Sequence, residues 1–145
     1  TAELVILREE LSRLGSCRVC TDDGSLGHKG VVTEQVKNLM EAMSVQAVYA
    51  VGPVPMMRAV SDLTRSYGVH TIVSLNPIMI DGTGMCGGCR VSVGGQVRFA
   101  CVDGPEFDAH GVDFNELWAR LGTYKEQEAH VCRLKAAADA AGKQP

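Results

Sequence analysis

The sequence predicts an α/β fold in which a parallel sheet with helices is followed by a small cysteine-rich β-hairpin subdomain and a C-terminal helix. Apolar runs of strand length alternate with helical periodicity up to about residue 76, which is typical of parallel sheets with right-handed crossovers. Glycine then becomes dense and the predicted strands become short. From Asp113 the pattern is helical again, with a break at Gly122.

The first elements are predicted from leucine spacing and turn residues. Leucines recur at spacings of three and four, which predicts an amphipathic helix closed by Gly15; they are Leu4, Leu7, Leu11 and Leu14. We expect a short strand over residues 16–21 and a turn over residues 22–25. A second helix is predicted from about Thr33, with four apolar residues on one face: Val36, Leu39, Met40 and Met43.

Two further strands and a helix complete the predicted sheet. Residues 47–51 are apolar throughout, as in a strand that helices cover on both faces. Pro55 opens a helix at a position where its missing N–H costs nothing, and Gly68 ends it. Its inward face is predicted to carry Met56, Val60, Leu63 and Tyr67. A strand over residues 69–75 follows, so we expect a first domain over residues 1–76.

The glycine-rich region is predicted to form a β-hairpin. Gly94-Gly95 is a two-residue turn signal between short strands at 91–93 and 96–99. We expect residues 77–112 to form a subdomain and residues 113–145 a helical tail, the last four residues of which fray. Val93 would pair with Gln96 across the turn.

Three cysteines gather at the open end of this hairpin. The stretch Asp81-Gly82-Thr83-Gly84-Met85-Cys86-Gly87-Gly88-Cys89 is followed, after eleven intervening residues, by Cys101. The predicted register places Cys89 opposite Ala100, beside Cys101. Because side chains alternate along a strand, the pairing must loosen or twist there for the two thiols to meet.

Thiols in this pattern suit either a tetrahedral zinc ion or an iron-sulfur cluster. Zinc ribbons favour two Cys-x-x-Cys knuckles, whereas this chain has one knuckle and one late cysteine. Gaps of four and then two residues match the plant-type two-iron spacing, with Asp81 in place of the first cysteine. The glycines would let backbone N–H groups approach inorganic sulfides. The pattern favours a two-iron two-sulfur (2Fe-2S) cluster, while zinc, uncoordinated thiols and a turn role for Asp81 are the alternatives.

Composition excludes several classes of function. A formal charge of −3 with scattered Lys and Arg offers no basic face for nucleic acid. No apolar run reaches the ~20 residues that span a bilayer, so we expect no membrane contact. The six cysteines follow no secreted disulfide framework and no signal peptide precedes them, which predicts the reducing cytoplasm. The remaining cysteines are interpreted as structural or incidental: Cys17, Cys20 and Cys132.

The sequence resembles the electron-transfer subunit family of dihydroorotate dehydrogenase B, within the ferredoxin-NADP reductase superfamily. The resemblance covers roughly residues 1–125 and rests on residues 20–25, residues 51–57 and the cysteine motif that ends at Cys101. It is closest to the small subunits called sulfide dehydrogenase beta subunit or NADH-dependent reduced ferredoxin:NADP oxidoreductase alpha subunit. In that subgroup Asp replaces the first cluster cysteine, as Asp81 does here.

The resemblance implies a C-terminal fragment with a partial ferredoxin-reductase-like sheet. Residues 1–76 would be the C-terminal part of an NAD(P)-binding domain, and the FAD-binding barrel of the family would be absent. The expected nucleotide-binding residues lie in two turns, near the nicotinamide (Gly52, Pro53, Met56, Met57) and on the adenosine side (Thr21, Asp22, Asp23, Gly24, Ser25). The nucleotide site would be half formed, and NAD versus NADP preference is left open.

The implied activity is that of an oxidoreductase subunit. The cluster would pass electrons from NAD(P)H and FAD, bound by the parent protein, to a larger flavoprotein or iron-sulfur partner subunit, or in the reverse direction. Its ligands would be Asp81, Cys86, Cys89 and Cys101, and it would be shielded by Met85 and Val102. No catalytic residue is expected in this part, which alone would be inactive. Asp81 favours the ferredoxin:NADP oxidoreductase or sulfide dehydrogenase type. The alternatives are the dihydroorotate dehydrogenase B subunit of pyrimidine biosynthesis and a zinc-stabilised binding module without a redox role.

Overall fold

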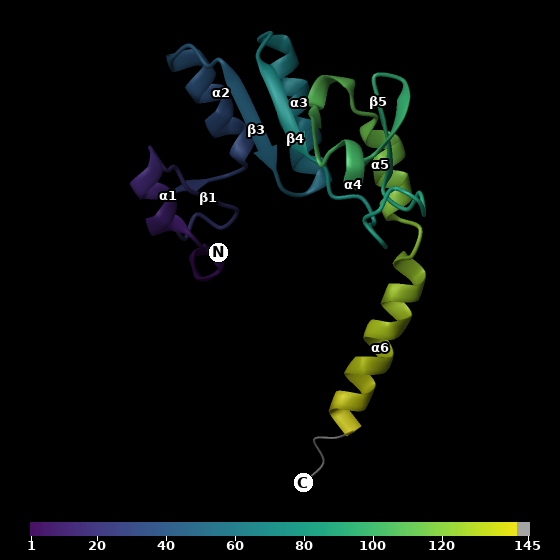
Figure 1. The fold of residues 1–145 in the computed structure, drawn as a ribbon. Helices are drawn as coiled ribbons and strands as arrows, with labels where there is room; N and C mark the ends of the chain where they lie inside the picture. Colours follow the sequence, from purple (N-terminus) through teal and green to yellow (C-terminus); the bar gives the residue numbers. More distant parts are fainter. Residues whose placement is uncertain (142–145) are drawn as a thin grey trace. The chain divides into compact units, whose positions relative to one another are not determined.

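A computed structural model describes residues 1–141 of the chain, with side chains up to residue 136. Two compact units are present, Thr1–Ile72 and the residues from Val73 onward. The division falls within strand β4 (His70–Ser74), the middle strand of a three-stranded sheet with the order β3-β4-β7. The predicted α/β class is confirmed, and the predicted fraying of residues 142–145 lies outside the described residues (Figure 1).

The first unit contains two short helices, two very short strands, and then a regular strand and helix pattern. In chain order its elements are η1 (Ala2–Leu4), α1 (Arg8–Leu14), β1 (Cys20–Thr21), β2 (His28–Lys29), α2 (Val32–Ala42), β3 (Ala47–Val51), α3 (Val54–Ser66) and the start of β4. Strands β1 and β2 are parallel and pair Cys20 with His28. The hydroxyl of Thr21 closes the loop between them by donating to the Leu26 carbonyl at 2.8 Å.

The N-terminal segment differs from its prediction. Helix α1 begins only at Arg8, because Leu7 adopts a left-handed conformation with φ 57° that interrupts the helix. The leucines that predicted an amphipathic face are exposed, with Leu4 at 78% and Leu14 at 86%. The leucine spacing therefore has helical periodicity, but no surface among the described residues covers these leucines. The strand predicted over residues 16–21 is reduced to β1, and β2 was not predicted.

Strand β3 and helix α3 form the centre of the first unit. Strand β3 has its predicted bounds and buries Ala50, but the prediction that both faces are covered is wrong within the described residues, since Tyr49 is 69% exposed. Helix α3 carries Pro55 in its first turn, as predicted. It buries a face that includes Met57 and Val60, which is rotated from the predicted one. The fully buried hydroxyls at this core satisfy each other: Thr71 donates to Thr64 at 2.6 Å.

The second unit is built around a β-hairpin and a helix. Its elements are the end of β4, β5 (Arg90–Val93), β6 (Gln96–Phe99), α4 (Ala100–Asp103), β7 (Glu106–Asp108), η2 (Ala109–Gly111), α5 (Phe114–Leu121) and α6 (Lys125–Ala141). Asp113 caps α5 by accepting hydrogen bonds from the Asn115 and Glu116 N–H groups. Leu117 of α5 and Val91 of β5 are each 1% exposed and belong to the core.

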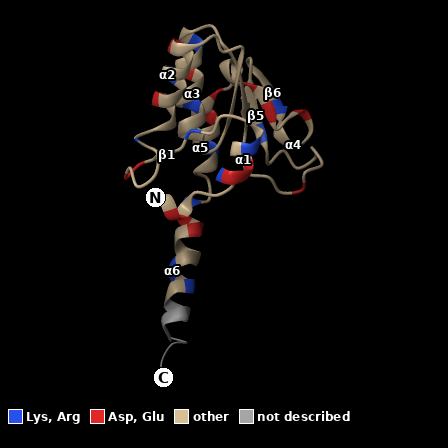
Figure 2. Cartoon of the chain, turned by 90° about the vertical axis from the view of Figure 1, so that its left-hand side faces the viewer, with Lys and Arg blue, Asp and Glu red and all other residues tan. Residues whose placement is uncertain are grey.

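Charged side chains of both signs are interspersed along the chain. Figure 2 shows Lys and Arg next to Asp and Glu on the helices of both units. Of the helices that the structure describes, none is long and apolar enough to cross a membrane.

Candidate metal centre

The hairpin places Cys89 at the predicted register. Val93 pairs with Gln96 across the turn, and the antiparallel ladder runs to Arg90 and Phe99. One step further, the Ala100 N–H donates to the Cys89 carbonyl at 3.2 Å. Cys89 is 2% exposed, so the end of β5 delivers its thiol into the interior of the second unit.

Helix α4 brings the distant cysteine to Cys89. Strand β6 ends at Phe99, whose N–H donates to the Asp103 carboxylate at 2.7 Å, and a single helical turn begins. This turn replaces strand alternation, so Cys101 does not point to the opposite face. The Sγ atoms of Cys89 and Cys101 lie 3.2 Å apart, and the Cys101 N–H donates to the Cys89 Sγ at 3.4 Å. The predicted disruption of the ladder at its open end is therefore a change from strand to helix.

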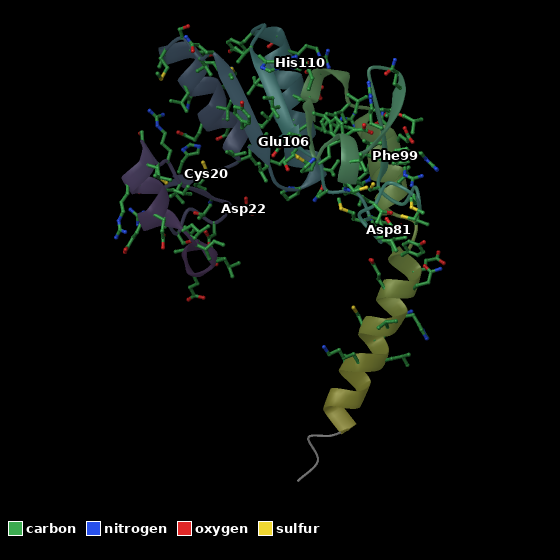
Figure 3. All side chains as sticks on the ribbon, viewed as in Figure 1. Cys20, Asp22, Asp81, Phe99, Glu106 and His110 are labelled. Atoms are coloured by element: carbon green, nitrogen blue, oxygen red, sulfur yellow. The ribbon has the colours of Figure 1, made fainter. Side chains whose placement is uncertain are left out.

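Asp81 and Cys86 form a second pair on the glycine-rich loop. The Asp81 carboxylate accepts a hydrogen bond from the Thr83 N–H at 3.0 Å. This bond and a further one from the Cys86 thiol hold the pKa of Asp81 below its ordinary value, because both favour the ionised carboxylate. Figure 3 shows Asp81 on the loop that carries sulfur-containing side chains. The lowered pKa favours an ionised Asp81 carboxylate beside the Cys86 thiol.

Gly84 connects the loop to the Cys101 turn. Its φ is +80°, and a Cβ at this position would lie 2.7 Å from the Val102 Cγ2, so no larger residue fits without movement. The Gly84 N–H also bonds to the Cys101 side chain. The pKa of Cys101 is nevertheless raised, mainly by its hydrogen bond with the Cys89 side chain and then by burial. The two donor pairs therefore belong to one packed unit.

The expected shielding residues do not cover this site within the described chain. Met85 is 87% exposed and Val102 is 61% exposed. Their side chains lie on the surface beside the loop, because the loop carrying Met85 has nothing packed over it in the described residues. The expectation that they exclude water is corrected accordingly.

The arrangement of donors tests which metal group the residues fit. Within the part of the chain that the structure describes, no three His, Cys, Asp or Glu side chains converge as the ligands of a single metal ion. The four predicted ligands instead form two pairs, Asp81 with Cys86 and Cys89 with Cys101. A structural zinc needs four donors around one point, whereas a two-iron cluster takes two terminal ligands on each iron. The residues fit the two-iron cluster better.

One residue near the centre was missed by the sequence analysis. The Arg120 guanidinium donates to the Gly88 carbonyl at 3.2 Å, across 32 positions of sequence. Gly88 lies between two predicted ligands, and its own N–H donates to the Cys86 Sγ at 3.4 Å. The available signal was a basic residue in the last turn of α5, which by itself indicates no contact with a loop far along the chain.

Part of the predicted nucleotide site surrounds a cavity in the first unit. A cavity of about 450 Å³ is lined by eight residues: Asp22, Val31, Val32, Thr33, Pro53, Pro55, Met56 and Ala59. Figure 3 labels Asp22 on the loop after β1. A Cβ on Gly52 would lie 2.5 Å from the Met56 Cε, so glycine leaves room for the conformation that the Met56 side chain adopts beside the turn. Met57 is fully buried and lies in the core, not at the cavity.

The other residues of the predicted adenosine-side loop shape its backbone. Asp23 accepts hydrogen bonds from the Ser25 N–H at 3.0 Å and the Ser25 hydroxyl at 2.6 Å. These bonds lower the pKa of Asp23, the hydroxyl contributing most. Gly24 takes the positive φ of the turn, and Thr21 closes it from the strand side. Thr21, Asp23, Gly24 and Ser25 thus set the loop that presents Asp22.

Comparison with known proteins gives a family match over the cysteine motif. Residues 76–113 match the family described as the iron-sulfur cluster binding domain of dihydroorotate dehydrogenase B. A Thermotoga maritima protein named dihydroorotate dehydrogenase B (NAD(+)), electron transfer subunit homolog, is 49% identical over 128 residues, which is 88% of this chain and 45% of the relative. The electron transfer subunit from Caldanaerobacter subterraneus is 36% identical over 112 residues, or 74% of this chain and 44% of the relative.

A solved structure gives the same result for the fold. It is titled as the NADH-dependent reduced ferredoxin-NADP oxidoreductase, in a study of flavin-based electron bifurcation, and matches with a TM-score of 0.82 and 47% identity. The match covers 89% of this chain and 46% of that chain. The predicted resemblance is confirmed, and the chain spans less than half the length of these relatives.

Proposed function

From this similarity to oxidoreductase electron-transfer subunits, we propose that the chain holds a 2Fe-2S cluster. The cluster passes electrons between two sides: a nicotinamide nucleotide and FAD on one side, and a partner subunit on the other. The ligands are Asp81, Cys86, Cys89 and Cys101. The FAD belongs to a longer parent protein, and the partner is a larger flavoprotein or iron-sulfur subunit. The chain contributes the cluster and part of the nucleotide-binding surface.

The observation that carries this proposal is the grouping of four donors into two pairs within a region that matches an iron-sulfur family. The Cys89 and Cys101 thiols, 3.2 Å apart, are close enough to share one iron after small rotations. Asp81 and Cys86 are in hydrogen-bond contact and would serve the second iron. A zinc-stabilised module is not supported, because the described residues offer no single point where three or more donors meet.

The protein residues have separate tasks at this centre. When bound, a two-iron cluster supplies one-electron transfer. The buried Cys89 anchors the centre to the core, and the α4 turn holds Cys101 against it. Asp81 supplies a harder, ionised donor, so the ligand set is less soft than four thiolates and the potential should differ from that of an all-cysteine site. Gly84 allows the loop to lie directly on α4.

For the nucleotide, we propose that Asp22, Pro53 and Met56 make direct contacts, because they line the cavity of the first unit. Gly52 makes room for Met56. Four loop residues act by shaping the backbone: Thr21, Asp23, Gly24 and Ser25. Met57 supports the turn from the core beneath it. The cavity contacts are mostly apolar, which suits a flat ring better than a phosphate group.

We assign the chain to the ferredoxin-linked type and not to the dihydroorotate type. The support is Asp81, which replaces the first cysteine as in the ferredoxin:NADP oxidoreductase subgroup. Sequence identity does not separate the two types, since it is 47% to the ferredoxin-NADP oxidoreductase structure and 49% to the dihydroorotate dehydrogenase B homolog. The assay is NADPH- and ferredoxin-dependent turnover by the chain in its longer parent, assembled with its partner. Dihydroorotate-dependent NAD reduction by that complex, without ferredoxin activity, would establish the other type.

The cluster itself is tested by anaerobic reconstitution of the full chain with iron and sulfide. We expect a reddish-brown protein with visible charge-transfer absorption and about two iron and two sulfide per chain, as the two-iron assignment requires. Cys132→Ser is the matched control, because Cys132 is an exposed cysteine of α6 and should not affect the colour, whereas Cys89→Ser should abolish it. A colourless protein with stoichiometric zinc after this treatment would establish the zinc module instead.

A further inference from the structure

Beyond the four ligands, a cation hydrogen-bonds to the loop that bears them, in addition to Arg90, whose Nη1 lies 3.9 Å from where a Cβ on Gly87 would be. Arg120 lies in the last turn of α5 and reaches back to the Gly88 carbonyl at 3.2 Å. Its charge is not neutralised: no ion pair joins Arg120 to a carboxylate among the described residues. Its buried Nε has no hydrogen-bond partner there either. A half-buried guanidinium with one weak contact needs a physical reason, since leaving such a group unpaired is costly.

The surroundings of Arg120 strengthen its electrostatic effect. It lines a small, partly open cavity of about 150 Å³, whose other lining residues include several apolar side chains: Pro77, Ile78, Ile80, Gly88, Leu117, Leu121, Thr123 and Tyr124. Charges near a protein surface interact more strongly than they do in bulk water. The cavity also borders the loop on the side of Ile80, which precedes the ligand Asp81. Arg120 therefore contacts the loop at Gly88 and shares this cavity with Ile80.

The position of Arg120 is fixed by its helix. The start of α5 is tied to the hairpin, because the Asp113 N–H donates to the Ser92 carbonyl at 2.9 Å. Leu117, one turn before Arg120, is fully buried. At the end of the helix the Thr123 hydroxyl donates to the Arg120 carbonyl at 2.7 Å. The Arg120 side chain thus extends from an anchored backbone.

We infer that Arg120 is a positioning residue for the cluster, which holds the Gly88–Cys89 peptide in place and stabilises the reduced cluster by its uncompensated positive charge. This inference rests on the proposed function. The Gly88 carbonyl and the Cys89 N–H belong to one planar peptide and point in opposite directions, so a bond to the carbonyl also sets the direction of that N–H. Three thiolates and a carboxylate make the cluster a net anion, and reduction adds negative charge. A nearby cation favours that reduced form.

Three substitutions separate the two roles. Arg120→Lys keeps the charge but loses the planar donor fork, Arg120→Gln keeps a donor without the charge, and Arg120→Met removes both. Arg98→Gln is the matched control, since Arg98 is an exposed residue of β6 and its loss changes the net charge equally. Each variant is made in the full chain and reconstituted anaerobically beside the wild type. Circular dichroism of the apo form verifies that each variant is folded.

The readouts are the midpoint potential, the electron paramagnetic resonance signal of the reduced cluster, and the rate of iron release to a chelator. We expect Arg120→Gln to lower the potential, and Arg120→Lys and Arg98→Gln to leave it close to the wild-type value. Arg120→Met should release iron about tenfold faster, as expected for loss of a hydrogen bond from a charged donor. The inference would be overturned if Arg120→Gln and Arg98→Gln had equal midpoint potentials and Arg120→Met released iron at the wild-type rate. A wild-type chain that forms no cluster would overturn the proposed function itself.

Discussion

The contact between Gly84 and Val102 gives the sharpest test of how the cluster loop is held. We consider Gly84→Ala, with Gly82→Ala as its matched control. Both glycines have a left-handed backbone, with φ of +80° and +73°. A Cβ on residue 84 would meet the Val102 Cγ2 at 2.7 Å, whereas a Cβ on residue 82 would have no atom within 4 Å. The two substitutions therefore share the conformational cost and differ in the contact.

The magnitudes follow from these two terms. A non-glycine residue in the left-handed region costs about 1–2 kcal/mol, which is the whole cost expected for Gly82→Ala. An overpacked contact adds about 1–3 kcal/mol, so Gly84→Ala should cost about 2–5 kcal/mol. Val102→Ala removes the clashing methyl group. Because Val102 is 61% exposed, its truncation alone should change stability by no more than about 0.5 kcal/mol.

The assay is urea unfolding of the reconstituted chain, followed by cluster absorption and circular dichroism. A double-mutant cycle between Gly84→Ala and Val102→Ala should give a coupling energy of about 1–3 kcal/mol, because the truncation relieves the clash. A value of 1.4 kcal/mol corresponds to a tenfold change in the folding equilibrium. Equal losses for Gly84→Ala and Gly82→Ala, or no recovery in the double variant, would refute the reasoning that α4 supports the loop through this contact.

Three further predictions concern single residues. Asp81→Ala should lose the cluster while Asp81→Cys keeps it with a shifted potential, measured by visible absorption and redox titration; unchanged values in both variants would make Asp81 a turn residue. Leu117→Ala should lower the free energy of unfolding by about 2–5 kcal/mol, because Leu117 is 1% exposed, whereas Leu4→Ala should change it by no more than about 0.5 kcal/mol, since Leu4 is 78% exposed. Ser25→Ala should raise the pKa of Asp23 toward its ordinary value in an NMR titration. A lowered folded-state pKa gives stability that is present above the unfolded-state pKa of about 3.9 and is lost as pH falls through the folded-state pKa. The Ser25→Ala variant should therefore lose less stability on acidification than the wild type. An Asp23 titration that is the same in the variant and the wild type would contradict this assignment.

The elements that the sequence predicts well are those with local causes. Gly94-Gly95 determines both the turn and the register, so Val93 and Gln96 pair as expected. Pro55 marks the first turn of α3 because its missing N–H is tolerated there. Asp113 similarly marks the start of α5, where its side chain satisfies free N–H groups.

Burial was harder to predict, because it depends on surfaces that periodicity does not describe. The spacing of Leu4 to Leu14 indicated a helix with an apolar face, yet those side chains are exposed and the helix begins late. Tyr49 lies in a continuous apolar run, but one face of β3 is open in the described residues. The buried face of α3 includes Met57, which had been assigned to the nucleotide, while its neighbour Met56 lines the cavity.

In the candidate centre, too, one pair of residues is brought together by local sequence and the other pair by contacts between distant segments. Asp81 and Cys86 come together within one glycine-rich loop, so their spacing in the sequence is sufficient to predict the pair. Cys89 and Cys101 meet only because the hairpin register and the α4 turn act together, and the sequence predicted the register but not the turn. A slip of one residue in that register would move Cys89 to the other face of the hairpin. The pairing of the thiols is therefore as well determined as the hairpin itself, which explains why a single late cysteine can complete the centre without a second Cys-x-x-Cys knuckle.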